Sequence, residues 1–287
     1  METAKRLYKS RKVKPPEPHK IPIRVVCVSD THNNQLDLPD GDLLIHAGDL
    51  SKNGTLEEIQ AQLDWLKAQK HQHKVVIGGN HDRLLDPTFP ERHPGILPLD
   101  TQFSNLNFGS LTYLSNTSAT LKFENGRDVK VYGSPFVPEC GKWAFMYPPG
   151  KDFWHGLIPV DADIVVSHGP PKWHLDLTGG GFENHGCPDL LKELKRVQPP
   201  LVIRGHIHEA HGEEDLLFDE VQSLYERIME TGGTSRRMML TLALKIYLWN
   251  LSKKGKRSTH LVNAAVVEGG RAIAERALAY EPVVCLI

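Results

Sequence analysis

The stretch Val25-Val26-Cys27-Val28-Ser29-Asp30-Thr31-His32 decides the fold of this chain. Its first four residues are small or β-branched and apolar, which is typical of a strand buried on both faces. The strand then gives way to Asp30 and His32, two residue types that bind metal ions. Because open α/β sheets bind ligands at the carboxyl ends of their strands, this junction predicts a site.

Four more apolar runs end in the same way. Leu43–Ala47 runs into Gly48-Asp49, Val75–Gly79 into Asn80-His81-Asp82, Ile164–Ser167 into His168, and Leu201–Arg204 into Gly205-His206-Ile207-His208. Any one of these junctions is explained as a capped strand or an Asx turn. The five together, in this order, form one composite motif and predict that their polar side chains share a site.

Helical patterns connect some of these strands. Leu56, Ile59, Leu63 and Leu66 have helical spacing, and Pro188–Val197 predicts a second, short helix. Each helix lies between two strands of the motif, which gives two βαβ units and a partly parallel sheet. Further strands are predicted at 111–114, 119–123, 129–132, 259–264 and 282–287. The chain is therefore expected to have an α/β fold.

Charge and cysteine content narrow the class of protein. The net charge of the 287 residues is -1, but residues 1–20 carry seven Lys or Arg against two Glu, so the remainder is near -6. No basic stripe accompanies the motifs, which argues against a nucleic-acid groove. The four cysteines have no short spacing, which excludes zinc ribbons and suits a reducing compartment, intracellular and cytoplasmic. The basic, proline-rich residues 1–21 lack the apolar core of a secretory signal and are expected to form a mobile arm.

One segment breaks the alternation of strands and helices. Leu217–Ile228 predicts an amphipathic helix, and the apolar run Met238–Leu251 fits either a strand or a helix packed on the body. That run of 14 residues is shorter than the roughly 20 that span a bilayer, so no transmembrane segment is expected, although contact with a membrane surface is a minor alternative. We expect a single domain over 22–287 with an insertion at about 213–257 that can bind a protein partner.

Taken together, the motifs D-x-H, G-D, G-N-H-D, S-H-G and G-H-x-H resemble those of the calcineurin-like metallophosphoesterase superfamily. The resemblance covers roughly residues 22–212 and, less securely, 259–287. Gly133–Pro135, Ser167–Pro171 and Gly186-Cys187 add a similarity to small metallophosphoesterase-domain proteins related to class III cyclic-nucleotide phosphodiesterases. The resemblance implies a four-layer α/β/β/α sandwich of two mixed sheets.

The chemistry of such a site requires a particular set of donors. Two divalent ions about 3.5 to 4 Å apart need a carboxylate that bridges them, and we assign this role to Asp49. The resemblance implies Asp30, His32 and His208 on one ion, and Asn80, His168 and His206 on the other. Mixed nitrogen and oxygen donors suit Mn, Fe or Zn, as a divalent or a mixed-valence pair.

A further histidine is expected to take part in the reaction without binding metal. His81 follows Asn80 directly, and the resemblance implies that it protonates the leaving group while a metal-bridging hydroxide attacks phosphorus. His46 lies within an apolar run and is expected to be a core histidine. The predicted function is hydrolysis of phosphate esters, with small phosphodiesters such as nucleotides favoured. The alternative is a non-catalytic scaffold, suggested by the insertion and the arm.

Two neighbouring enzyme classes fit the sequence less well. Phosphoprotein phosphatases of the superfamily carry G-D-x-x-D-R-G, whereas Gly48-Asp49 continues here as Leu50–Gly54. A nuclease would need a basic groove. The aromatic residues within Phe136–Leu157 fit either loop packing or the wall of a substrate pocket, and the sequence does not choose between them.

Overall fold

The computed structural model describes residues 1–13, 19–98, 101–150, 152–178, 183–252, 258–268 and 278–287. The chain divides into two compact units. We call residues 18–214 and 261–287 the sheet unit, and residues 1–17 and 215–260 the helical unit.

The first sheet of the sheet unit has the strand order β13-β1-β2-β3-β4. Strands β1 to β4 run parallel, and β13 is antiparallel to β1. Helix α2 connects β2 to β3, which confirms the first predicted βαβ unit. The elements are β1 (Arg24–Val28), β2 (Leu43–His46), α2 (Leu56–Lys67), β3 (His73–Val76), β4 (Thr112–Tyr113) and β13 (Val283–Leu286).

The second sheet has the order β11-β12-β10-β9-β6-β5. Strands β6, β9 and β10 are parallel and β5 is antiparallel to β6, so this sheet is also mixed. Helix α4 connects β9 to β10 as predicted. The elements are β5 (Thr117–Lys122), β6 (Asp128–Ser134), β9 (Ile164–Ser167), α4 (Pro188–Val197), β10 (Leu201–Arg204), β11 (Gly212–Leu216) and β12 (Thr259–Asn263).

Short elements occupy the connecting loops. Strands β7 (Val137–Pro138) and β8 (Met146–Tyr147) pair with each other. The loops also contain α3 (Phe89–Arg92) and the 3-10 turns η1 (Arg83–Leu85), η2 (Phe103–Asn105) and η3 (His208–Ala210).

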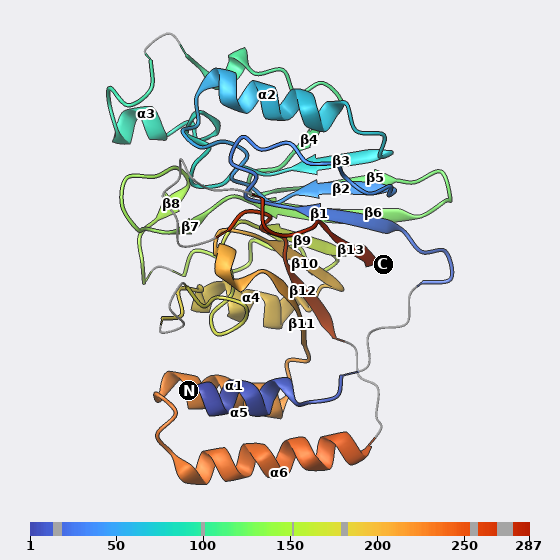
Figure 1. Ribbon diagram of the computed structural model, residues 1–287, viewed down its shortest axis with the longest axis vertical. Helices are drawn as coiled ribbons and strands as arrows, with labels where there is room; N and C mark the ends of the chain where they lie inside the picture. The colour runs from blue at the N-terminus through green and yellow to red at the C-terminus, as the bar shows by residue number, and fades with distance from the viewer. Residues whose placement is uncertain (14–18, 99–100, 151, 179–182, 253–257, 269–277) are drawn as a thin grey trace. The chain divides into compact units, whose positions relative to one another are not determined.

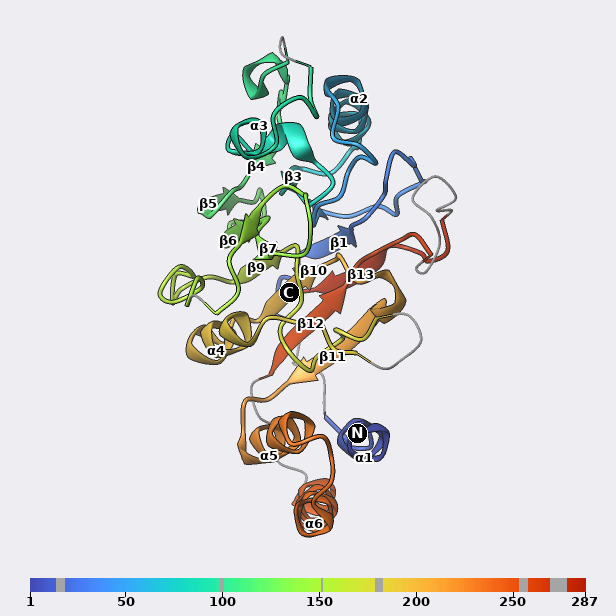
Figure 2. The same ribbon diagram turned by 90° about the vertical axis from the view of Figure 1, so that its left-hand side faces the viewer.

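The alternation of side chains along the strands produces the layers. On β1, Val25 and Cys27 enter an apolar core built from both sheets, whereas Val26 and Val28 enter a second core that includes residues of α2. Within the sheet unit, α2 covers the outer face of the first sheet and α4 that of the second (Figures 1 and 2). The predicted four-layer α/β/β/α sandwich of two mixed sheets is confirmed.

The helical unit joins segments that lie far apart in the sequence. Helices α1 (Glu2–Lys9), α5 (Glu220–Glu230) and α6 (Arg236–Ser252) contact one another. Tyr8 stacks on Tyr225 with ring centroids 4.3 Å apart, and the Arg11 guanidinium forms two hydrogen bonds with the Asp219 carboxylate. Residues 14–18 of the segment 1–21, for which the sequence predicts a mobile arm, lie outside the described residues, and its first turns form helix α1. These first turns form a helix because Ala4 and Tyr8 are buried against α5 and α6.

The predicted insertion at about 213–257 overlaps the helical unit. Residues 215–260 form one compact unit together with residues 1–17. The run Met238–Leu251, for which the sequence left strand and helix open, is part of α6. In the described part of the chain, no helix is long and apolar enough to cross a membrane.

Candidate metal centre

The five strand-to-loop junctions meet at one edge of the two sheets. Four of the polar residues there, Asp30, His32, Asp49 and His206, have backbone φ angles between 44° and 71°. Non-glycine residues rarely adopt this left-handed conformation, which costs on the order of 1 to 3 kcal/mol each and concentrates at functional sites. The loops thus adopt a strained backbone that turns these side chains inward.

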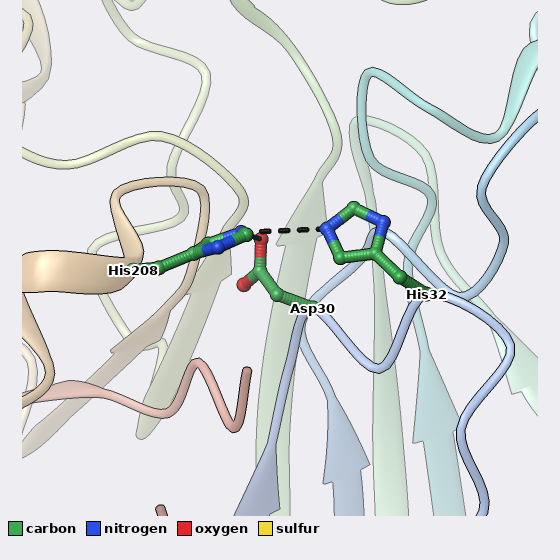
Figure 3. Close-up of side chains that lie close together, drawn as sticks. All are labelled: Asp30, His32 and His208. Atoms are coloured by element: carbon green, nitrogen blue, oxygen red, sulfur yellow. Dashed lines mark hydrogen bonds and ion pairs between the residues drawn. The ribbon is translucent and has the colours of Figure 1, made fainter. Parts of the chain in front are cut away.

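The first group consists of Asp30, His32 and His208 (Figure 3). The Nε2 of His208 lies 3.1 Å from Asp30 Oδ1 and 3.3 Å from His32 Nε2. Each imidazole has its Nδ1 next to a backbone carbonyl, that of Ser51 for His32 and that of Glu268 for His208. In the tautomer with the proton on Nδ1, this nitrogen donates to the carbonyl and Nε2 offers its lone pair to the group.

The second group consists of Asn80, His168 and His206. The Oδ1 of Asn80 lies 3.1 Å from His168 Nε2 and 2.8 Å from His206 Nδ1. His168 Nδ1–H donates to the carbonyl of Ala47 at 2.9 Å, which directs its Nε2 toward Asn80 and Asp49. The three side chains come from loops after β3, β9 and β10, as the sequence predicted.

Asp49 lies between the two groups. Its Oδ2 is 3.7 Å from His32 Nε2 and its Oδ1 is 3.4 Å from His168 Nε2. One carboxylate oxygen therefore faces each group. This is the arrangement that a bridging carboxylate requires.

The electrostatics of the site favour cations. Burial lowers the pKa of His32 and of His206 to about 3, so both imidazoles are neutral, the form that binds metal. Burial also tends to lower the pKa of His168, but the carboxylates of Asp49 and Asp30 outweigh it and raise that pKa to about 9. The buried carboxylates thus attract positive charge to the space between the groups.

These residues fit a pair of metal ions. Their donor atoms converge: His32 Nε2 and His208 Nε2 lie 3.3 Å apart, and Asn80 Oδ1 lies 3.1 Å from His168 Nε2. Imidazole, carboxylate and amide donors together suit Mn, Fe or Zn.

Two neighbouring residues support the loops. The Asp82 carboxylate accepts hydrogen bonds from the backbone N–H groups of Leu50, Ser51 and Gly79, which ties the loop of Asp49 to that of Asn80. His46 is fully buried, accepts the N–H of Gly48 at Nδ1, and has Nε2 3.0 Å from the Thr31 hydroxyl. It is a satisfied core histidine, as the sequence predicted.

His81 lies beside this centre. Its Nδ1 is 2.8 Å from the carbonyl of Lys52, its backbone N–H donates to Asp49 Oδ1, and its Nε2 is 4.0 Å from Asp49 Oδ2. The rings of His32 and His81 meet edge to face at 4.7 Å. Because His32, Asp49 and His81 also form a group that could hold an ion, the geometry permits either a ligand or a proton donor at this position.

Two residues next to His81 were not assigned to the site from sequence. The indole of Trp143 lies 4.3 Å from the His81 ring, and the Arg83 guanidinium lies 5.0 Å from the same indole. Tyr147 and Phe153 instead stack on each other at 4.2 Å. The aromatic residues within Phe136–Leu157 therefore differ in their surroundings. Trp143 lies beside the centre, whereas Tyr147 and Phe153 pack against each other in the loop. Arg83 follows the G-N-H-D motif directly in the sequence, and a basic residue at that position was the signal that could have identified it.

We expect Gly205→Ala to disrupt the centre from the backbone. A Cβ at this position would lie 2.0 Å from Asp30 Oδ2 and 2.0 Å from Ser29 Oγ, so Asp30 would have to move. Displacing a ligand or its support typically weakens metal affinity by about 10- to 100-fold. Titration with Mn²⁺ followed by calorimetry measures this loss.

Gly126→Ala is the matched control for this prediction. Gly126 has a positive φ, +84°, and open space lies around its Cβ position. It should cost about 1 kcal/mol of stability and leave metal affinity unchanged. Equal metal affinity in Gly205→Ala and Gly126→Ala would contradict the placement of Asp30.

Comparisons with known proteins agree with this geometry. The family model of the calcineurin-like phosphoesterases matches residues 23–210. A protein of Emericella nidulans named probable rhamnogalacturonate lyase C is 42% identical over 88% of this chain and 24% of its own length. Human metallophosphoesterase domain-containing protein 1 is 34% identical over 69% of this chain and 65% of its own. A UPF0046 protein of Caenorhabditis elegans is 34% identical over 66% of this chain and 65% of its own.

The chain thus spans about a quarter of the first of these relatives and 65% of each of the other two. The family match covers all five junctions that supply the polar side chains of the centre. The resemblance inferred from the motifs is confirmed, and the chain belongs to the calcineurin-like phosphoesterase family.

Proposed function

We propose that the sheet unit is a metal-dependent phosphoesterase that binds two metal ions and hydrolyses small phosphodiesters. The observation that carries this proposal is the position of Asp49, whose two carboxylate oxygens face two separate groups of donors. We assign Asp30, His32 and His208 to one ion, Asn80, His168 and His206 to the other, and Asp49 to both. When bound, a pair of such ions supplies Lewis-acid stabilisation of the phosphoryl oxygens and lowers the pKa of water.

His81 supplies the proton in this proposal. Its Nδ1–H donates to the carbonyl of Lys52, which fixes the ring and leaves Nε2 directed at the centre. A proton carried at Nε2 passes to the oxygen of the leaving group as its bond to phosphorus breaks. Histidine is the side chain that most often acts as a general acid in enzymes.

Arg83 and Trp143 support a diester with a sizeable leaving group. Among the described residues, the buried Nε of Arg83 has no hydrogen-bond partner, and the guanidinium lies over the Trp143 indole. Trp143 in turn contacts His81, the proposed proton donor to that leaving group. An aromatic or anionic leaving group would therefore meet a flat apolar face and a positive charge next to the reacting atoms.

Hydrolysis of bis-p-nitrophenyl phosphate tests the proposal. The purified full chain supplied with Mn²⁺ should hydrolyse this diester, and a chelator should remove the activity because the ions supply most of the stabilisation of the transition state. Readdition of Mn²⁺ should restore it. A chain that binds two ions but hydrolyses neither diesters nor monoesters would contradict the proposal and favour a scaffold role.

A further inference from the structure

Helix α6 carries apolar side chains on two opposite faces. Leu242 and Ile246 are buried, so one face contributes to the core of the helical unit. On the other face, five large apolar side chains are between 54% and 73% exposed. They are Leu240, Leu244, Tyr247, Leu248 and Leu251.

The five exposed residues form a continuous stripe. Their spacing of four, three, one and three positions places them on one side of an α-helix. The stripe extends from Leu240 to Leu251 and so runs along about 17 Å of the helix. Single exposed apolar residues are ordinary on protein surfaces, but a continuous stripe of this size marks a surface that binds something apolar.

Basic residues begin α6 and follow it in the sequence. Arg236 and Arg237 begin the helix, and the sequence that follows it contains Lys253, Lys254, Lys256 and Arg257. The residues of the helical unit include fourteen Lys or Arg and seven Asp or Glu, a net charge of +7. Because the whole chain has a net charge of -1, all other residues together carry -8. Positive charge is thus concentrated in the unit that exposes the stripe.

This charge pattern favours one binding partner for the exposed face of α6. A second copy of the chain would bring two units of net charge +7 together at this face, which is unfavourable. An anionic lipid surface attracts this positively charged unit while it buries the apolar stripe. We propose that the exposed face of α6 binds the surface of anionic membranes, with the helix lying in the plane of the interface.

Vesicle flotation of the full chain tests this. The wild-type protein should float with vesicles of phosphatidylcholine and phosphatidylserine, and much less with vesicles of phosphatidylcholine alone. High salt should also reduce flotation, because salt screens the positive charge of the helical unit. Leu244→Glu/Leu248→Glu should weaken partitioning by at least about tenfold. Arg236→Gln/Arg237→Gln should weaken it roughly fivefold for each charge removed while leaving the apolar stripe intact.

Val160→Glu is the matched control, because it places the same charge on an apolar residue of the sheet unit that is 72% exposed. It should float like the wild type. The melting temperature of each variant verifies that Leu242 and Ile246 keep their packing. Absence of flotation with anionic vesicles would overturn the proposal, as would equal partitioning of Leu244→Glu/Leu248→Glu and Val160→Glu. A wild-type dimer that the double variant abolishes, without any vesicle binding, would assign the face to a second copy.

Discussion

Replacing Asp49 by Asn is expected to lower kcat/KM for a phosphodiester by at least about 10³-fold. The amide introduced by Asp49→Asn would still offer one oxygen to the backbone N–H of His81, which in the wild type donates to Asp49 Oδ1. The NH₂ group of that amide would then face His32, whose Nε2 lies 3.7 Å from Asp49 Oδ2 in the wild type. The variant therefore loses both the negative charge and one of the two oxygens that face the two groups. It should bind at most one ion tightly.

The measurement combines steady-state kinetics with metal analysis of the purified variant. Asp161→Asn is the control, because Asp161 is a surface carboxylate that pairs with Lys130 away from the centre. It should retain wild-type kcat/KM and metal content. Two tightly bound ions and unchanged turnover in Asp49→Asn would show that Asp49 is not the bridge.

Replacing His81 by Gln should separate proton donation from metal binding. With a poor leaving group such as an alkoxide, we expect kcat to fall by about 10² to 10⁴-fold, the range of general acid catalysis. With p-nitrophenolate, which leaves without protonation, the loss should be much smaller. Metal content should not change, since the proposal places no ion on His81.

The control for His81 is His155→Gln, because the side chain of His155 is 80% exposed. The kcat of His155→Gln should equal that of the wild type with both leaving groups. Loss of one ion from His81→Gln would instead make His81 a ligand, which its distance to His32 and Asp49 permits. An equal loss of kcat with both leaving groups would argue against proton donation.

The sheet unit could be predicted from sequence because each of its motif strands is marked by a short pattern of neighbouring residues. Each strand of the motif is an apolar run, and in parallel sheets the carboxyl ends of neighbouring strands lie at one edge. Placing Asp30, Asp49 and His168 at that edge required only the strand boundaries, which the structure reproduces at β1, β2 and β9.

Helix α6 could not be predicted in the same way. Its apolar residues at 240, 242, 244, 246 and 248 satisfy a strand's period of two, and they also give a helix with two apolar faces. The contacts of α6 with α1 and α5 favour the helix over a strand. Helix α1 lies more than two hundred residues before α6 in the sequence, so a local pattern does not reveal this contact. Trp143 and Arg83 reach His81 through contacts that no local pattern encodes.

Anomalous scattering from crystals of the full chain grown with Mn²⁺ tests the central claim most directly. The account predicts two manganese peaks about 3.5 to 4 Å apart with the Asp49 carboxylate between them. Asp30, His32 and His208 should lie around one peak, and Asn80, His168 and His206 around the other. A single peak, or two peaks that Asp49 does not join, would contradict it.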